Sequence, residues 1–143
     1  MTNQKTTQKR PPIRLLAAES DLVANLALQA EGQQPVVAAM LLEEIERAEL
    51  YKAETMPSGH VQLGSHVTFV DEQAQETRDV QLVLPGKADI AKGRISILTP
   101  MGAALYGLAD GHSIDWPDLR GNNRTIRVVR VLPEQPHVAA GPN

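Results

Sequence analysis

The stretch ISILTPMGAALYGLADGHSIDW, residues 95–116, decides the fold of this 143-residue chain. Apolar residues alternate with small or polar ones as far as Thr99-Pro100, and a second alternation closes the stretch. An alternation of period two is typical of strands, so a short helix is predicted between two strands. Thr99 suits the N-cap of that helix, Pro100 suits its first turn, and Gly107 can end it in the left-handed conformation. The helix is interpreted either as a structural corner or as a docking point.

Two amphipathic helices are predicted before this stretch. Ser20 suits the N-cap of the first helix, which is expected to run to about Ala30 over roughly 16 Å. Pro35 begins the second, in which apolar residues recur at i, i+3 and i+4 until Met56-Pro57 ends it after about 20 residues. Two such helices joined by a short turn predict an antiparallel hairpin, in effect a short coiled coil.

After Pro57 the apolar period changes from that of a helix to that of a strand. The sequence thus predicts an α+β fold, in which a helical hairpin at 13–56 precedes a domain at 57–135 with a five-stranded, mostly antiparallel sheet and one short helix. Residues 1–12 are predicted to be a disordered tail, and residues 136–143 a second tail. The predicted strands are centred on 67–69, 80–84, 95–97, 114–116 and 126–132.

The composition excludes several classes of function. Cys is absent, and none of the four His residues has the spacing of a metal site, so no metal and no other cofactor is expected. The chain has no phosphate-binding glycine loop and no nucleophile elbow, which favours a binding protein over an enzyme. The dense acidic run is interpreted as a solvated helix face; its members are Glu43, Glu44, Glu46 and Glu49.

Charge and hydropathy indicate which classes of partner and which cellular location to expect. Residues 15–56 hold eight acidic side chains against two basic ones, which disfavours direct binding of nucleic acid. The basic residues at 1–14 either touch an acidic partner or belong to a solvated terminus. No apolar run approaches the roughly 20 residues of a membrane span, and no secretory signal is recognisable, so a cytoplasmic location is expected.

Two long segments resemble a known family. They are MPSGHVQLGSHVTF, residues 56–69, and LVLPGKADIAKGRISILTPMGAALYGLADGHSIDW, residues 82–116. Both are similar to the C-terminal domain of the bacterial transcript-cleavage factors GreA and GreB. LLEEIERAELYKAETMP, residues 41–57, resembles the branch of that family called regulator of nucleoside diphosphate kinase (Rnk). The resemblance covers about residues 13–133 and implies a helical hairpin followed by an FKBP-like domain.

The resemblance also implies a partner and its contact residues. It implies docking on bacterial RNA polymerase at the rim of the secondary channel, with the hairpin pointing inward. The implied contact residues are Thr99, Pro100, Met101, Gly102 and Ala103, together with Glu31, Gln33 and Gln34 at the hairpin tip. An exposed turn fixed by proline loses little entropy on binding, which suits that role.

The sequence departs from the family pattern at two places. Cleavage factors carry paired acids at the hairpin tip that help to hold a catalytic Mg²⁺ in the polymerase, whereas Glu31 is alone here. The usual Gly-Asp is Gly111-His112, which is expected to be a structural detail. Prolyl isomerase activity, another property of FKBP-like folds, is disfavoured by the scarcity of aromatic residues.

Three hypotheses remain open at this stage. The first is a regulator that competes with cleavage factors for the polymerase without activating cleavage. The second is a modulator of nucleoside diphosphate kinase, acting directly or indirectly. The third is transcript-cleavage stimulation through Glu31.

Overall fold

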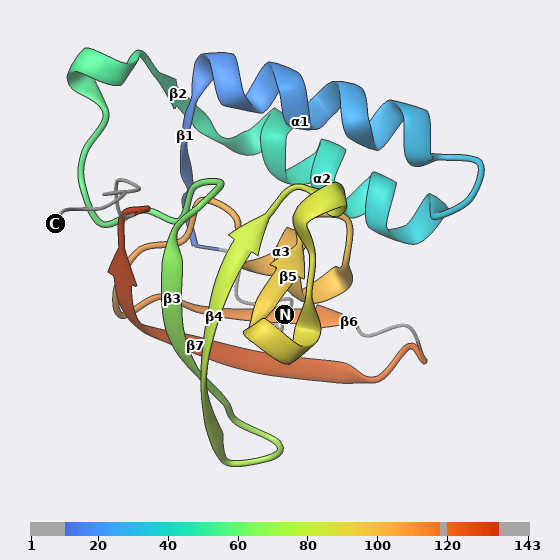
Figure 1. Cartoon of the computed structure of the whole chain (residues 1–143), viewed down its shortest axis with the longest axis vertical. Coiled ribbons are helices and arrows are strands. Elements are labelled where there is room, and N and C mark those ends of the chain that lie inside the picture. The colour runs from blue at the N-terminus through green and yellow to red at the C-terminus, as the bar shows by residue number, and fades with distance from the viewer. Residues whose placement is uncertain (1–10, 118–119, 135–143) are drawn as a thin grey trace, which may run out of the picture.

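The computed structural model describes residues 11–117 and 120–134, in which two N-terminal helices lie beside a five-stranded sheet (Figure 1). This arrangement confirms the predicted α+β class. The two predicted tails fall outside the described residues, except for Pro11 and Pro12.

The hairpin consists of α1 (Ala17–Ala30) and α2 (Pro35–Arg47). With 14 and 13 residues, each helix is roughly 20 Å long. The prediction that Ser20 caps the first helix was wrong. Ser20 is buried inside α1, and its hydroxyl donates a hydrogen bond of 2.8 Å to the carbonyl of Ala17. A serine hydroxyl can bond backwards in this way within a helix, so residue type alone did not locate the helix start.

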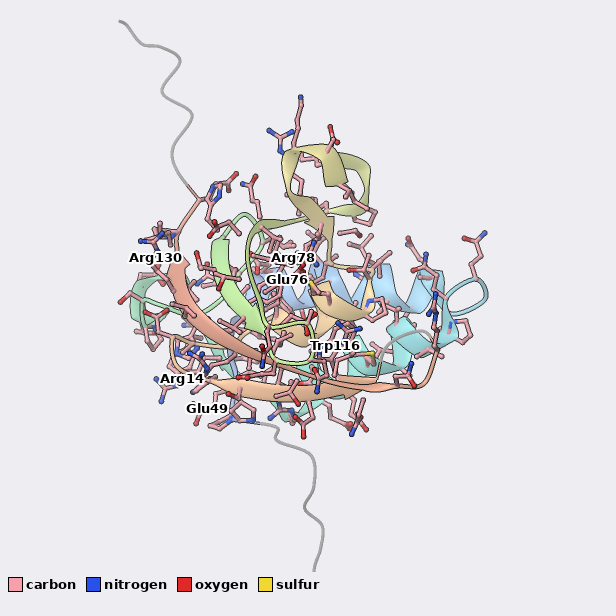
Figure 2. All side chains as sticks on the ribbon, turned by 90° about the horizontal axis from the view of Figure 1, so that it is seen from below. Arg14, Glu49, Glu76, Arg78, Trp116 and Arg130 are labelled. Atoms are coloured by element: carbon pink, nitrogen blue, oxygen red, sulfur yellow. The ribbon has the colours of Figure 1, made fainter. Side chains whose placement is uncertain are left out.

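A short parallel pair of strands closes the base of the hairpin. The chain leaves the helical conformation at Ala48 and forms β2 (Glu49–Tyr51), which pairs with β1 (Arg14–Leu16). The prediction of a helix as far as Met56 was therefore wrong, because strand pairing replaces the last helical turns. The guanidinium of Arg14 donates to the carboxylate of Glu49 at 3.1 Å across this pair (Figure 2).

The main sheet has the strand order β5-β4-β3-β7-β6. Neighbouring strands are antiparallel except β4 and β5, which are parallel. The five predicted strands are confirmed, with shifted ends: β3 (His66–Asp71), β4 (Glu76–Val83), β5 (Arg94–Ser96), β6 (Ser113–Pro117) and β7 (Asn123–Leu132). The short helix α3 (Pro100–Leu105) follows β5, and single 3₁₀ turns span Ala53–Thr55, Pro85–Lys87 and Ile90–Lys92.

One apolar core joins the hairpin to the sheet. Helix α2 packs on α3, and α3 packs on β5 and β6. Gly107, two residues after the end of α3, has φ +85°, and a Cβ there would lie 2.7 Å from the Cβ of Ile13. The chain at the hairpin base thus approaches too closely for any side chain at this position. Hairpin residues of the shared core include Val23, Ala27, Val37, Ala38 and Leu41, and the rest of the core includes Phe69, Leu82 and Ile126 of the sheet, Leu105 of α3 and Tyr106 directly after it.

Candidate functional site

The turn between β5 and α3 is held by the chemistry that its sequence predicts. The hydroxyl of Thr99 accepts a hydrogen bond from the backbone N–H of Gly102 at 3.0 Å and donates to the carbonyl of Ser96 at 2.7 Å. Pro100 occupies the first turn of α3, where its missing N–H costs nothing. The predicted cap is confirmed, and it gives the turn a fixed shape.

Two of the five residues assigned to partner contact are buried in this turn. A Cβ at Gly102 would lie 2.2 Å from the carbonyl oxygen of Ser96, and the side chain of Ala103 is fully buried. They let α3 lie close against β5, whereas Thr99, Pro100 and Met101 are partly exposed. Of the five, only Thr99, Pro100 and Met101 thus present side-chain surface, and Gly102 and Ala103 serve packing.

The hairpin tip is an exposed turn fixed by its backbone. The carbonyl of Ala30 accepts hydrogen bonds from the N–H groups of Gln33, at 3.1 Å, and Gln34, at 2.7 Å. The carbonyl of Gln34 in turn accepts from the N–H of Ala38 at 3.0 Å, which begins α2. The side chains of Glu31, Gln33 and Gln34 are exposed, so the tip can meet a partner.

The fold brings the hairpin tip and the β5–α3 turn together. A groove of about 360 Å³ runs between them, and we call it the tip groove; its lining residues are Gln33, Gln34, Pro35, Val36, Val37, Leu98, Thr99 and Pro100. Glu31 is not among them. The side chain of Val36 is 52% exposed and offers apolar surface there. Two segments that were singled out separately in the sequence, the hairpin tip and the β5–α3 turn, thus line one groove.

The apolar half of the tip groove was not predicted from the sequence. Val36 lies off the buried stripe of α2, and Leu98 lies between the end of β5 and the helix cap. An exposed apolar residue directly after a helix-starting proline was the available signal for Val36. Nothing in the local sequence indicated that Leu98 would lie near it.

The half-buried carboxylate of Glu19 joins α1 to the segment before β3 and to the end of α3. One oxygen of Glu19 accepts hydrogen bonds from the hydroxyl of Tyr106 and from the backbone N–H of Leu63, each at 3.1 Å. Burial raises the pKa of Glu19 above its usual value of 4.5, although the two hydrogen bonds act in the opposite direction. This contact helps to set the position of the hairpin, and thus of the tip groove.

The acidic run is only partly a solvated helix face, because Glu49 lies in β2 and Glu44 is buried. Glu44 is buried and accepts from the guanidinium of Arg47 at 2.5 Å, while Arg47 also donates to the carbonyl of Pro11 at 2.7 Å. The prediction of a wholly solvated face was therefore wrong for Glu44, because a long arginine side chain shields it and ties the start of the described chain to α2. Among residues 11–117 and 120–134, no group of three His, Cys, Asp or Glu is arranged to hold a metal ion.

The paired imidazoles of His60 and His112 have a structural explanation. Their ring centroids lie 6.4 Å apart, and Nδ1 of His112 accepts from the backbone N–H of Ala109 at 3.1 Å. Burial, together with the charges of His60 and Arg14, lowers the pKa of His112. His112 thus closes the turn after Ala109, which agrees with its predicted structural role.

The helices of the described chain include none with the length and hydropathy that crossing a membrane demands.

Comparison with known proteins places this geometry in a family. The family described as transcription elongation factor GreA/GreB, C-terminal, matches residues 56–133. The regulator of nucleoside diphosphate kinase of Escherichia coli K12 is 33% identical over 130 residues, which cover 91% of this chain and 95% of that protein. GreA of Brucella anthropi is 29% identical over 116 residues, which cover 78% of this chain and 73% of that protein.

A solved structure supports the same assignment. The prokaryotic transcription elongation factor GreA/GreB from Nitrosomonas europaea aligns with a TM-score of 0.65 and 33% identity, over 85% of this chain and 98% of that chain. The similarity to this protein and to the Escherichia coli regulator extends over the hairpin as well as the sheet. The chain therefore belongs to the GreA/GreB family of transcription elongation factors, in which it is similar to a regulator of nucleoside diphosphate kinase along nearly its whole length.

Proposed function

We propose that this chain is a non-enzymatic regulator of transcription that binds bacterial RNA polymerase near its secondary channel and competes there with GreA and GreB. The family assignment supports the general role. The tip groove carries the finer proposal, because a single partner element lying in it would contact Gln33 and Gln34 together with Thr99 and Pro100.

The chemistry of the tip groove suits protein docking. Its lining is mainly apolar, with the amides of Gln33 and Gln34 as additional hydrogen-bonding groups, and protein interfaces likewise combine apolar and polar side chains. Both walls are preorganised by backbone hydrogen bonds and by the Thr99 cap, so little ordering entropy opposes binding.

Stimulation of transcript cleavage is the alternative action at the same place. Glu31 is the single carboxylate of the tip sequence QAEGQQP, residues 29–35. Protein-bound Mg²⁺ usually has one or two carboxylate ligands besides its other oxygen ligands, so a single exposed glutamate provides only the minimum number of carboxylates. A competitor that blocks cleavage is therefore the preferred proposal.

A competition assay tests the proposal. A labelled cleavage factor is bound to core RNA polymerase, this chain is added, and both displacement and cleavage of a backtracked transcript are measured. We expect displacement together with loss of cleavage. Val36→Glu puts a charge into the tip groove at the exposed start of α2, where a carboxylate is compatible with the helix dipole. It should raise the half-displacing concentration at least about tenfold.

Leu22→Glu is the matched control, because Leu22 on α1 is 46% exposed and lies outside the tip groove. It should displace the labelled factor as the unaltered chain does. Absence of displacement by the unaltered chain would contradict polymerase competition. Equal displacement by the Val36→Glu variant would contradict the assignment to the tip groove.

A direct action on nucleoside diphosphate kinase is the second candidate, favoured by the similarity to the Escherichia coli regulator of that name. Purified chain would be added to purified kinase, and the rate of phosphate transfer between nucleotides measured. A changed rate at stoichiometric chain supports direct modulation, and an unchanged rate leaves only an indirect connection.

A further inference from the structure

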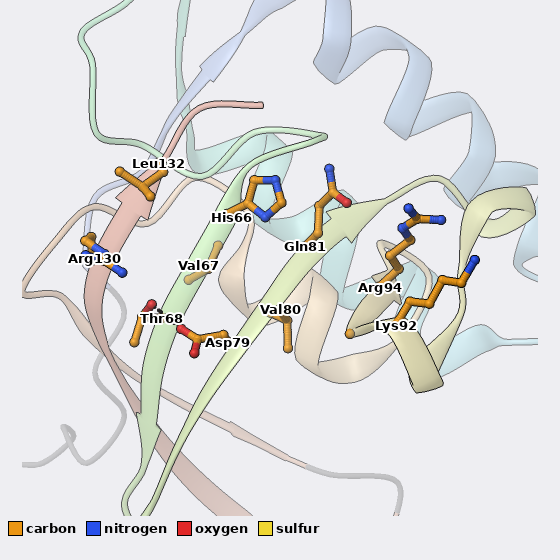
Figure 3. Close-up of a pocket in the computed structure, with 11 residues that line it drawn as sticks. His66, Val67, Thr68, Asp79, Val80, Gln81, Lys92, Arg94, Arg130 and Leu132 are labelled. Atoms are coloured by element: carbon orange, nitrogen blue, oxygen red, sulfur yellow. Dashed lines mark hydrogen bonds between the residues drawn. The ribbon is translucent and has the colours of Figure 1, made fainter. Parts of the chain in front are cut away.

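The outer face of the main sheet carries a second groove, which the docking proposal does not use. It has a volume of about 540 Å³ and lies over β3 and β4, between the start of β5 and the end of β7 (Figure 3). Along β3, the exposed His66 and the half-buried Thr68 alternate with the buried Val67 and Phe69. Because successive strand residues face opposite sides, this groove lies on the face turned away from the core. We call it the sheet groove.

Cations dominate the sheet groove. Lys92 and Arg94 line one side, Arg130 lines the other, and Asp79 is the single carboxylate in the lining (Figure 3). One oxygen of Asp79 already accepts a hydrogen bond from the hydroxyl of Thr68. Within the described residues, none of the three cations takes part in an ion pair. A chain of net charge −3 thus concentrates unpaired positive charge at one hollow of its surface.

Sheet register places the cations on both sides of a shared floor. Arg94 pairs with Gln81 across β5 and β4, and Thr68 pairs with Arg130 across β3 and β7. Strands β5 and β7 are separated by β4 and β3, which makes their distance roughly 14 Å at the usual strand spacing. Arginine and lysine side chains can therefore reach inward from both sides to a ligand lying over the two middle strands.

We propose that the sheet groove binds a compact anion that carries two or more phosphate groups. Guanidinium groups pair with phosphate oxygens through two parallel hydrogen bonds, and the ammonium of Lys92 adds a point charge. Cations on opposite sides suit an anion with charge at both ends better than a single phosphate. The exposed imidazole of His66 lies between them as a further hydrogen-bonding group.

A free oligophosphate and the backbone of RNA share this chemistry. Single-stranded nucleic acid is usually held by aromatic rings on which bases stack, together with a basic groove. The lining of the sheet groove contains no Phe, Tyr or Trp. The free oligophosphate is therefore the favoured ligand, whether it stands alone or forms part of a small molecule.

Isothermal titration of the full chain with sodium tripolyphosphate at low salt tests the proposal. We expect saturable binding with a Kd below about 1 mM. Replacing Arg94 and Arg130 by Gln should raise that Kd at least about tenfold, since each arginine supplies charge-assisted hydrogen bonds. Arg127→Gln is the matched control on β7, because Arg127 is exposed, lies outside the sheet groove and faces Glu72 at 3.4 Å. It should bind as the unaltered chain does.

Several outcomes would overturn the proposal. Absence of heat up to about 10 mM tripolyphosphate would show that the hollow is not an anion site. An equal loss in the Arg127→Gln variant would reveal nonspecific attraction. Tighter binding of a short single-stranded RNA would assign the groove to nucleic acid, and equal competition by an oligoglutamate peptide would remove the preference for phosphate. No polymerase is present, so these results are independent of the proposed docking.

Discussion

The carboxylate of Glu19 accepts a hydrogen bond of 3.1 Å from the hydroxyl of Tyr106, across 87 residues of sequence. Glu19 lies in the first turns of α1, and Tyr106 directly follows α3. The contact therefore joins the hairpin to the element that bears the Thr99 turn. The relative position of the two walls of the tip groove depends on such contacts.

Tyr106→Phe should lower the free energy of unfolding by about 1–3 kcal/mol. The change keeps the buried ring and removes one donor to the half-buried carboxylate of Glu19, and hydrogen bonds to charged groups have about this value. Urea unfolding followed by circular dichroism measures it. A loss below about 0.5 kcal/mol would mean that the hydroxyl contributes little to holding the hairpin.

The raised pKa of Glu19 predicts a pH dependence of stability. The folded chain binds this proton more tightly than the unfolded chain does, so the stability associated with protonated Glu19 is full below the unfolded value of 4.5. It is lost as the pH rises through the raised folded value. Glu19→Gln removes this titration, and its free energy of unfolding should change less over that range. Parallel pH curves for both proteins would contradict the prediction.

The lowered pKa of His112 predicts that the free energy of unfolding decreases as the pH falls. Its neutral Nδ1 accepts from the N–H of Ala109, and its pKa is lowered from 6.5 by burial first and by neighbouring positive charge second. The stability from neutral His112 is present above 6.5 and is lost as the pH falls through the lower folded value. His112→Asp can accept the same hydrogen bond and should lose less stability over this range. Urea midpoints of both proteins across the range provide the measurement.

Gly102→Ala should destabilise the chain by at least about 2 kcal/mol. A Cβ at this position would lie 2.2 Å from the carbonyl oxygen of Ser96, so the start of α3 must move away from β5. Gly32→Ala in the hairpin tip is the control, because a Cβ there meets nothing within 4 Å. Thermal unfolding compares the two. A Gly102→Ala variant as stable as the control would show that the turn accommodates the methyl group.

The sequence predicted features whose chemistry is local and missed those that depend on distant segments. Thr99 and Pro100 each act through residues a few positions away, so their roles could be inferred from type and spacing, whereas the close approach of Ile13 to Gly107 could not. Strands β1 and β2 have three residues each and pair across 35 positions, so no alternation announces them. The second helix was predicted to continue through β2 because the pairing of β2 with the distant β1 has no local signal in the sequence.

In the candidate site, too, local features were predicted and contacts between distant segments were not. Gln33 and Thr99 were each singled out by the sequence, but only the packing of α2 on α3 brings them to one groove. The burial of Glu44 also depends on a distant segment, because Arg47 shields it while bonding to Pro11. Residue type predicted the charge of the acidic run and could not predict which member turns inward.

The β1–β2 pair gives the hairpin a closed base. The chain enters and leaves the hairpin on two strands that are hydrogen-bonded side by side, so residues 17–48 form an insertion with a fixed base. Adding one turn at the tip end of each helix would move the tip about 5.4 Å outward, past the Thr99 turn, and would leave the strand pairing and the buried residues of both helices in place. Such an architecture lets selection lengthen an arm without redesigning the body that carries it.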